Sequence, residues 1–239
     1  FLLYLHSLYN ISRFLKKNAM ARTPLKSWIL IAVLLTLLSA GLLSLNMRGR
    51  GADSPVRVAC VGDSITLGND APESFPGQLS KLLGEGWDVR NFGHNDTAVI
   101  ARSEKPYSRR HSFRRARQFK PDIVIILLGT NDSREQNWKY KDDFVKDYLA
   151  LIKAFQRLPS RPRIILCYPP PAFSDLGGIN DAVIRDEIIP MIGDAAKQAG
   201  LQTIDLYEEF KDKQQLFPDT IHPSSLAAGI IAKKVYRFI

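Results

Sequence analysis

The sequence predicts an α/β domain of three layers, in which helices cover both faces of a parallel β-sheet. Three observations support this prediction. Five apolar segments of strand length recur between residues 56 and 239, and segments with helical character separate them. The segments around Val58 and Ile125 are apolar without alternation, as in strands buried on both faces. Regular alternation of strands with helices is typical of such domains.

The expected strands follow one another at intervals that leave room for one helix each. They are VRVACVG (56–62), WDVRNFG (87–93), DIVIILLG (122–129), RIILCYPP (163–170) and QTIDLY (202–207). Several are rich in β-branched residues, which favour strands. The helices expected between and after them are residues 75–84, 108–119, 140–157, 180–199 and 225–238. A domain of about 190 residues can bury one sizeable core, so we expect one globular unit over residues 56–239.

The first fifty residues differ in charge from the rest of the chain. They contain seven Lys or Arg and no Asp or Glu, whereas the other 189 residues contain 26 basic and 24 acidic side chains. The formal net charge of +9 is therefore mostly a property of the amino terminus. This uneven distribution weakens any inference from the high isoelectric point to nucleic-acid binding, and we expect no nucleic-acid partner.

An uncharged apolar segment, WILIAVLLTLLSAGLLSL, occupies residues 28–45 and is just long enough to cross a bilayer as a helix. We expect a basic amino-terminal segment (1–27), a transmembrane or signal-anchor helix (28–45) and a linker (46–55) before the folded domain. Small residues suited to cleavage are poorly placed after the apolar segment. This favours a membrane-anchored protein with an extracytoplasmic domain over a protein secreted after signal cleavage.

A short polar segment, GDSITLG at residues 62–68, ends the first expected strand. Gly, Asp and Ser are common turn residues, so the segment alone is compatible with a plain turn. It also fits a nucleophile, because ligands of parallel sheets bind beyond the carboxyl ends of the strands. Ser64 attacks an ester only when a neighbouring base removes its proton.

The loop before the last expected helix, FPDTIHPS at residues 217–224, contains a candidate for that base. Histidine is the side chain whose pKa suits proton transfer near neutrality. Asp219 precedes His222 by three residues, a spacing at which the carboxylate can fix the imidazole tautomer and leave the other ring nitrogen for Ser64. The structural alternative is that Asp219 starts a turn and His222 caps the final helix.

The segment GTND at residues 129–132 offers a hydrogen-bond donor for the negative oxygen of a tetrahedral intermediate. The Asn131 side-chain amide is that donor, and the backbone N–H of Ser64 is a second. The loop after Gly93 offers a third. Taken alone, Asn131 is equally compatible with capping a turn.

Four segments, GDSITLG, NFG, GTND and DTIHPS, follow four expected strands in this order. In this respect the chain resembles the SGNH hydrolases, also called GDSL esterases, over residues 56–239. The resemblance implies a flavodoxin-like five-stranded parallel sheet with strand order 2-1-3-4-5. It implies a catalytic triad of Ser64, Asp219 and His222, and an oxyanion hole that includes Asn131 and the Ser64 amide. It implies no metal ion and no other cofactor.

One segment departs from the pattern of that family. A second glycine usually follows NFG within three residues and donates its N–H to the oxyanion, whereas NFGHNDT places Asn95 or Asp96 there. Asn and Asp tolerate left-handed backbone better than other non-glycine residues. We therefore expect the N–H of Asn95 or Asp96 to replace that of the glycine.

The implied strand order also bears on the two cysteines. Cys60 and Cys167 fall on strands two spacings apart, which places them about 9.6 Å from each other. A disulfide bridges Cα atoms no more than about 7 Å apart. Both cysteines are therefore expected to be buried free thiols.

Among these hydrolases, the segments GTNDSREQNW, YKDDFVKDYLALI and PPP most resemble bacterial carbohydrate O-acetylesterases. This resemblance implies a serine esterase that removes O-acetyl groups from carbohydrates, so that an acetylated carbohydrate is the expected partner. Trp138, Tyr168 and Tyr107 are candidates for stacking on a sugar face, although such aromatic residues also pack loops. A lysophospholipase or thioesterase acting on lipid acyl groups is the alternative within the same superfamily.

Two further interpretations remain open at this stage. Residues 102–120 contain eight basic residues and one acidic residue, Glu104, which fits either a solvated helix face or attraction to acidic glycans or anionic lipids. A non-catalytic phosphate or nucleotide binder would use Gly62–Gly68 as its loop. That segment lacks both common glycine-rich phosphate-binding motifs.

Overall fold

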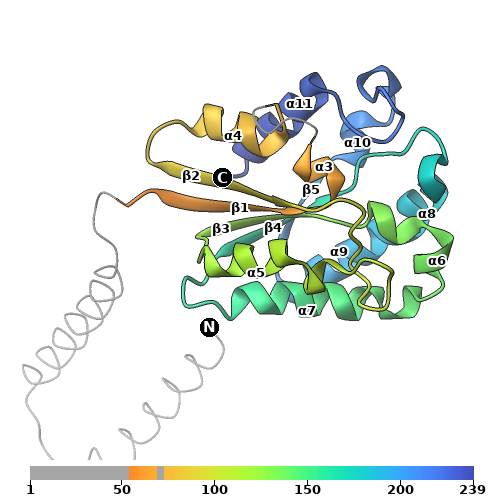
Figure 1. Ribbon diagram of the computed structural model, residues 1–239, viewed down its shortest axis with the longest axis horizontal. Coiled ribbons are helices and arrows are strands. Elements are labelled where there is room, and N and C mark those ends of the chain that lie inside the picture. The colour runs from red at the N-terminus through yellow and green to blue at the C-terminus, as the bar shows by residue number, and fades with distance from the viewer. Residues whose placement is uncertain (1–53, 69–72) are drawn as a thin grey trace, which may run out of the picture. The chain divides into compact units, whose positions relative to one another are not determined.

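The computed structural model describes residues 54–68 and 73–239 (Figure 1). The segments expected at residues 1–27 and 28–45, and most of the linker at 46–55, lie outside the described residues. Within the part that is described, no helix combines the length and apolar character needed to cross a membrane.

A five-stranded parallel sheet forms the centre of the domain (Figure 1). Its strands are β1 (Val56–Gly62), β2 (Trp87–Gly93), β3 (Ile123–Leu127), β4 (Arg163–Tyr168) and β5 (Gln202–Asp205). Their spatial order is β2-β1-β3-β4-β5, which confirms the order implied by the family resemblance. β4 ends two residues earlier than expected because Pro169 and Pro170 have no backbone N–H for the ladder.

Helices cover both faces of the sheet, as the sequence predicts (Figure 1). On the upper face of the view lie α3 (Ser64–Leu67), α4 (Phe75–Leu83), α10 (Tyr207–Phe210) and α11 (Ser225–Tyr236). On the lower face lie α5 (His111–Gln118), α7 (Phe144–Gln156) and α9 (Ile189–Ala199). Each of the five expected helices is present, with ends that differ by a few residues.

The differences concern short segments at the carboxyl edge of the sheet. The helix expected at 180–199 consists of α8 (Asp181–Val183), a π-helical turn (Ile184–Ile188) and α9. The sequence analysis did not anticipate α3, α6 (Glu135–Trp138) or α10. Each of these three contains about one turn, which is too short to produce a helical pattern of apolar residues.

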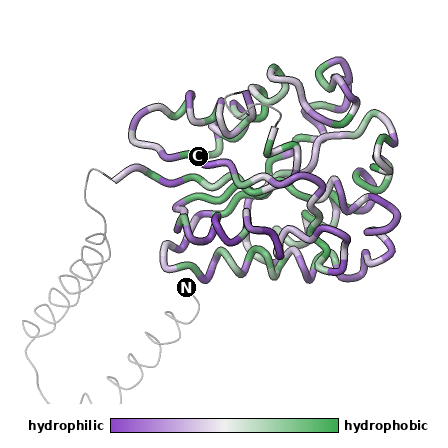
Figure 2. The backbone as a smooth tube through the Cα atoms, in the orientation of Figure 1, coloured by the Kyte–Doolittle hydropathy of each residue, from purple (hydrophilic) through white to green (hydrophobic). Residues whose placement is uncertain are grey.

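Alternate residues of the strands pack into two separate hydrophobic cores, one between the sheet and each helical layer. Ala59 and Val61 of β1 pack with α5, α7 and α9, whereas Val58 and Cys60 pack with α4 and α11. Figure 2 shows hydrophobic residues concentrated along the strands between the two layers. Because the sheet is covered on both sides, its strands read as continuous apolar segments, as predicted.

Cys60 and Cys167 are buried free thiols on β1 and β4, which confirms that prediction. Burial raises the pKa of the Cys167 thiol to about 12. The pKa of Cys60 is raised as well, by burial first and then by the neighbouring Cys167. Both sulfurs therefore stay protonated and pack as small apolar side chains.

Candidate active site

Ser64, His222 and Asp219 meet at the carboxyl edge of the sheet, although 158 residues separate the first two. The Ser64 Oγ atom lies 2.8 Å from Nε2 of His222. On the other side of the imidazole ring, Nδ1 lies 2.7 Å from Oδ2 of Asp219. The three side chains thus form a continuous chain of hydrogen bonds from hydroxyl to carboxylate.

Ser64 is the first residue of α3, and the preceding residue fixes the start of that helix. The Asp63 side chain is the N-cap and accepts a hydrogen bond of 2.9 Å from the backbone N–H of Ile65. Such caps satisfy N–H groups that the first turn of a helix leaves without partners. The short helix therefore holds the Ser64 hydroxyl at the end of β1, half-buried and facing the last loop.

Asn91 at the end of β2 holds the other end of α3. Its amide nitrogen donates to the backbone oxygens of Thr66 and Leu67, each at 2.9 Å, and its Oδ1 accepts from the N–H of Gly93 at 2.9 Å. The sequence analysis assigned no role to Asn91. Its place two residues before the glycine of NFG is the signal that was available.

Gly93 allows the close approach between β2 and α3. A Cβ atom at this position would lie 2.3 Å from the backbone nitrogen of Leu67. No side chain fits in that space, so the glycine in NFG is required by packing rather than by a turn.

The turn that carries the base is held by its own carboxylate. Oδ1 of Asp219 accepts the backbone N–H groups of Ile221 at 3.0 Å and His222 at 2.6 Å. Thr220, which follows Asp219, has left-handed backbone with φ of 70°, which is uncommon for a β-branched residue. Partial burial alone would raise the pKa of Asp219, but the hydrogen bonds from His222 and Ile221 outweigh it and lower the pKa. Asp219 is therefore ionised beside the imidazole at neutral pH.

Asn131 contacts Asp63, the residue before Ser64, from the 3₁₀ turn Thr130–Ser133 after β3. Gly129 supplies the turn with φ of 133°, a conformation that side chains rarely adopt. The buried Asn131 amide donates to Oδ2 of Asp63 at 3.3 Å and to the backbone oxygen of Thr97 at 3.2 Å. Both distances exceed the commonest N–H···O distance of about 2.9–3.0 Å.

The loop after β2 has left-handed backbone at Asp96, with φ of 61°, and not at Asn95. The Asp96 carboxylate pairs with Lys105 at 2.9 Å and with Arg134 at 3.0 Å. The hydrogen bond from Lys105, assisted by that from Arg134, overcomes partial burial and lowers the pKa of Asp96. The side chain of Asp96 is therefore directed to two cations.

Two fully buried carboxyl groups hold the turn that carries Asn131, and no role was predicted for either of them. Asp63 holds Asn131, while Asp132 accepts the N–H groups of Val99 and Ile100 at 2.9 to 3.0 Å. Burial raises the pKa of each carboxyl to about 7, although the backbone N–H groups oppose the shift. Asp132 thereby ties the loop after β2 to the turn that carries Asn131.

The three aromatic candidates for sugar stacking differ in their surroundings. Tyr107 is fully buried and its hydroxyl donates to the backbone oxygen of Phe92 at 2.7 Å, so its prediction as a stacking residue is wrong. The Tyr168 side chain packs against the lower helical layer, with its hydroxyl next to Gly193 of α9, which does not suit stacking. Trp138 is 8% exposed and packs edge-on against Phe144, yet it lines a cavity.

The basic segment at residues 102–120 forms the exposed face of α5 and the loop before it. Arg102 pairs with Asp143, and Arg117 stacks over the ring of Phe113 at 5.4 Å. These contacts fit the solvated helix face, which was one of the two interpretations. Among the described residues, no cluster of three or more His, Cys, Asp or Glu side chains is placed to hold a metal ion.

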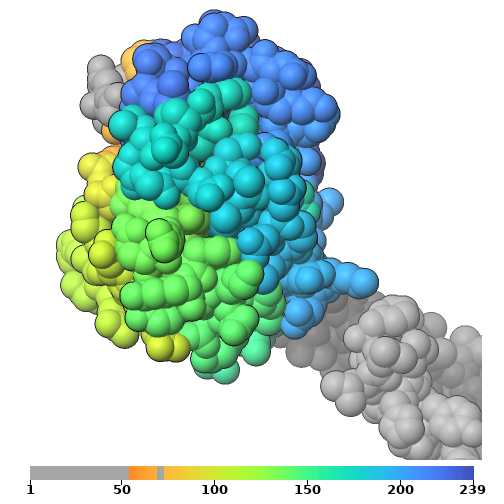
Figure 3. Space-filling view, turned by 90° about the vertical axis from the view of Figure 1, so that its right-hand side faces the viewer, coloured from red at the N-terminus to blue at the C-terminus, as the bar shows by residue number. Residues whose placement is uncertain are grey.

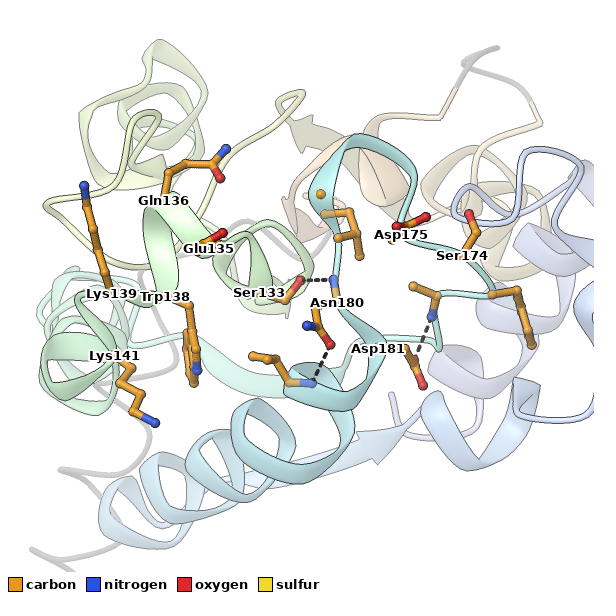
Figure 4. Close-up of a pocket in the computed structure, with 15 residues that line it drawn as sticks. Ser133, Glu135, Gln136, Trp138, Lys139, Lys141, Ser174, Asp175, Asn180 and Asp181 are labelled. Carbon is orange, nitrogen blue, oxygen red and sulfur yellow. Dashed lines mark hydrogen bonds between the residues drawn. The ribbon is translucent and has the colours of Figure 1, made fainter.

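Two cavities open at this edge of the sheet. One has a volume of about 430 Å³ and is lined by Ser64, Asp219 and His222 together with residues at the start of α4 and α11. The other has a volume of about 840 Å³ and lies between α6 and the loop after β4 (Figure 4).

Comparison with known proteins agrees with this geometry. Residues 60–228 match the GDSL-like lipase/acylhydrolase family. The chain belongs to this family. The resemblance drawn from the sequence motifs is thereby confirmed, and membership places the domain among the carboxylic ester hydrolases.

An acetylxylan esterase of Xylanibacter ruminicola is 39% identical to the chain over 203 residues. The match covers 76% of the chain but only 42% of that protein, so the chain spans less than half the length of this relative.

Solved structures share the fold at lower identity. A carbohydrate acetylesterase from Sinorhizobium meliloti is 17% identical with a TM-score of 0.61, and the match covers 77% of this chain and 100% of that one. An aryl esterase from M. smegmatis is 18% identical with a TM-score of 0.60, and the match covers the same shares of the two chains.

Proposed function

We propose that the protein is a serine esterase that removes O-acetyl groups from carbohydrates through a covalent acyl-enzyme. The contact between Ser64 and His222, with Asp219 behind the imidazole, is the observation that carries this proposal. A hydroxyl within hydrogen-bond reach of a base, which a carboxylate orients in turn, is the arrangement that nucleophilic acyl transfer requires.

In the first half of the reaction, Nε2 of His222 accepts the proton of the Ser64 hydroxyl as Oγ attacks the acetyl carbonyl carbon. Asp219 holds the Nδ1 proton and stabilises the imidazolium that forms. When the tetrahedral intermediate collapses, the bond to the sugar oxygen breaks and His222 gives its proton to that oxygen. A water molecule then attacks the acetyl-serine with the same proton transfers, which releases acetate and restores Ser64.

The negative oxygen of the intermediate is stabilised by three donors in this proposal: the backbone N–H of Ser64, the side-chain amide of Asn131 and the backbone N–H of Asp96. We assign the last role to Asp96 rather than Asn95 because Asp96 has left-handed backbone, the conformation for which glycine is favoured. The long bonds from Asn131 to Asp63 and Thr97 leave its hydrogens available for sharing with an oxyanion.

The acetylated carbohydrate is inferred from the acetylxylan esterase relative, whose identity to this chain is high enough to suggest a related substrate. A lipid acyl hydrolase of the same family is the second candidate. Acyl-chain length distinguishes the two: the rate on p-nitrophenyl esters should fall from acetyl to octanoyl for an acetylesterase and rise for a lipase.

The proposal is tested with p-nitrophenyl acetate and an acetylated xylan, using the wild type, Ser64→Ala and His222→Ala. Each substitution is expected to lower kcat by about a thousandfold or more, because the triad acts as a unit. Ser108→Ala and His111→Ala are matched controls on the exposed surface and should retain activity. A fully active Ser64→Ala protein would disprove the mechanism.

A further inference from the structure

The larger cavity, which we call the α6 hollow, has no role in the triad chemistry. It is lined on one side by α6 and the preceding turn, from Ser133 to Lys141, and on the other by residues 172–183 (Figure 4). Figure 3 shows these two segments, in green and cyan, side by side on the face that Figure 1 presents at its right edge. Its volume of about 840 Å³ is twice that of the cavity beside Ser64.

The α6 hollow is adjacent to the residues of the proposed mechanism. On one wall, Ser133 is two residues from Asn131 in the same 3₁₀ turn. On the other wall, the backbone N–H of Phe173 donates to Thr220 at 2.9 Å, and the hydroxyl groups of Ser174 and Thr220 form a hydrogen bond. Because Thr220 lies between Asp219 and His222, a substrate held at Ser64 has the hollow next to it.

Hydrogen bonds join the two walls of the hollow and fix its shape before a ligand binds. The backbone N–H of Asn180 donates to the Ser133 hydroxyl at 3.0 Å, as drawn in Figure 4. The Asp181 carboxylate accepts the N–H of Ala172 at 2.9 Å and the hydroxyl of Tyr207 at 2.7 Å. A cavity held by such bonds does not need to form when a ligand binds, which lowers the cost of binding.

The lining has the chemistry of a site for a neutral, hydroxyl-rich ligand. Its floor is apolar and consists of Trp138, Ala172 and Ile179. Its rim carries uncharged hydrogen-bonding groups and charges of both signs: Gln136, Ser174, Asn180, Glu135, Asp175 and Lys139. The ammonium group of Lys141 is already paired with Glu187 at 2.7 Å. With Lys141 paired, the charged lining residues that remain are three carboxylates, of Glu135, Asp175 and Asp181, and one lysine, Lys139. This acidic excess disfavours uronates and phosphates, so the lining favours neutral sugars.

We propose that the α6 hollow is a glycan subsite that binds the unacetylated sugar units next to the acetylated one. This inference rests on the proposed function and adds to it a preference: acetylated neutral oligosaccharides are better substrates than acetylated monosaccharides. A hollow of this volume exceeds what an acetyl group requires, and sugar rings present both apolar C–H faces and hydroxyl groups to such a lining.

Gln136→Trp tests the proposal by placing an indole at the mouth of the hollow. Gln136 is exposed on α6, so the variant is expected to fold, and Gln118→Trp on α5 is the matched control away from the hollow. kcat/KM is measured for p-nitrophenyl acetate, monoacetylated methyl xyloside, monoacetylated xylotetraose and p-nitrophenyl octanoate.

The wild type should favour the xylotetraose ester over the xyloside ester by about tenfold, the discrimination that a modest set of pocket contacts gives. Gln136→Trp should lower that ratio to about one, mainly through a higher KM, and leave p-nitrophenyl acetate within about twofold of wild type. Gln118→Trp should keep the wild-type ratio.

Equal rates on the two sugar esters in the wild type, or an unchanged ratio in Gln136→Trp, would overturn the inference while leaving the esterase assignment intact. A selective loss on p-nitrophenyl octanoate in Gln136→Trp would make the hollow an acyl-chain site instead. If Ser64→Ala hydrolyses p-nitrophenyl acetate as well as the wild type, the proposed function itself fails, so the two failures are distinguishable.

Discussion

At the scale of single residues, the site depends on a turn of four residues that directs one carboxylate to two tasks. Oδ1 of Asp219 accepts two backbone N–H groups and thereby shapes the turn, while Oδ2 contacts the imidazole. The backbone bonds involve only Oδ1 of Asp219 and no atom of the imidazole ring. The geometry of the base is therefore fixed before the reaction begins.

Asp219→Asn separates these two tasks. The amide oxygen can still accept the backbone N–H groups, but an amide nitrogen at Oδ2 would donate to Nδ1 and favour the tautomer with its proton on Nε2. That tautomer cannot accept the proton of Ser64. kcat should therefore fall by about a thousandfold or more with little change in thermal stability, measured by steady-state kinetics and thermal unfolding. A small loss of kcat would show that Asp219 acts only through the turn.

The structure brings three of the polar residues predicted from the motifs into contact, while their catalytic roles stay predictions. It does not support the stacking role predicted for Tyr107. Ser64, Asp219, His222 and Asn131 lie on loops, and the topology of a parallel sheet brings such loops to one edge. The burial of Tyr107 was not foreseeable from its neighbours. A tyrosine beside arginines is compatible with both a surface and a core, and only the tertiary packing decides between them.

At the scale of elements, α3 places the Ser64 hydroxyl beside His222, and this helix has only four residues. So short a helix is not stable by itself. Asp63 caps its start, Asn91 binds its last carbonyl groups, and Gly93 lets β2 approach it closely. The position of Ser64 is thus determined by the ends of two strands.

Asn91→Ala is expected to loosen α3. The substitution removes both donors to the carbonyl groups of Thr66 and Leu67, and buried groups left without partners cost about 1–3 kcal/mol each. The free energy of unfolding should fall by that order, and kcat should fall more than KM rises. Urea unfolding and steady-state kinetics measure the two effects.

Asn91→Asp is the companion variant. It keeps the acceptor for Gly93 but cannot donate to the two carbonyl groups, so it should behave like Asn91→Ala. Wild-type stability and activity in both variants would show that the Asp63 cap and the packing at Gly93 hold α3 without Asn91.

At the scale of the whole molecule, the buried carboxyl groups of Asp63 and Asp132 make the free energy of unfolding depend on pH, and Asp132 serves as the example. The pKa of Asp132 is about 7 in the folded protein because of burial, against an ordinary value of 3.8. Between these values the folded protein retains a proton that the unfolded chain releases. Raising the pH through this range therefore favours unfolding. The stabilisation that protonated Asp132 contributes to the folded state is fully present below about pH 4, and it is lost as the pH approaches about 7.

Asp132→Asn removes the titration and keeps an oxygen for the N–H groups of Val99 and Ile100. Its free energy of unfolding should rise relative to the wild type as the pH increases from about 4.5 to about 7.5. Urea unfolding of both proteins at the two pH values tests this. A constant difference between them would mean that Asp132 does not hold its proton in the folded state.

The overall architecture was the most predictable feature. The five strands, their order and the two helical layers follow from continuous apolar segments and from the family resemblance. The exact ends of β4 and the breaks around α8 depend on prolines and on contacts with distant loops, which periodicity does not report. The expected membrane segment at residues 28–45 lies outside the described residues and stays a prediction.

The separation of 158 residues along the sequence between Ser64 and His222 has a consequence for protein synthesis. Ser64 is synthesised long before Asp219 and His222, which are the carboxylate and the base of the proposed mechanism. A nascent chain that stops before Asp219 therefore carries an inert hydroxyl, however complete its sheet.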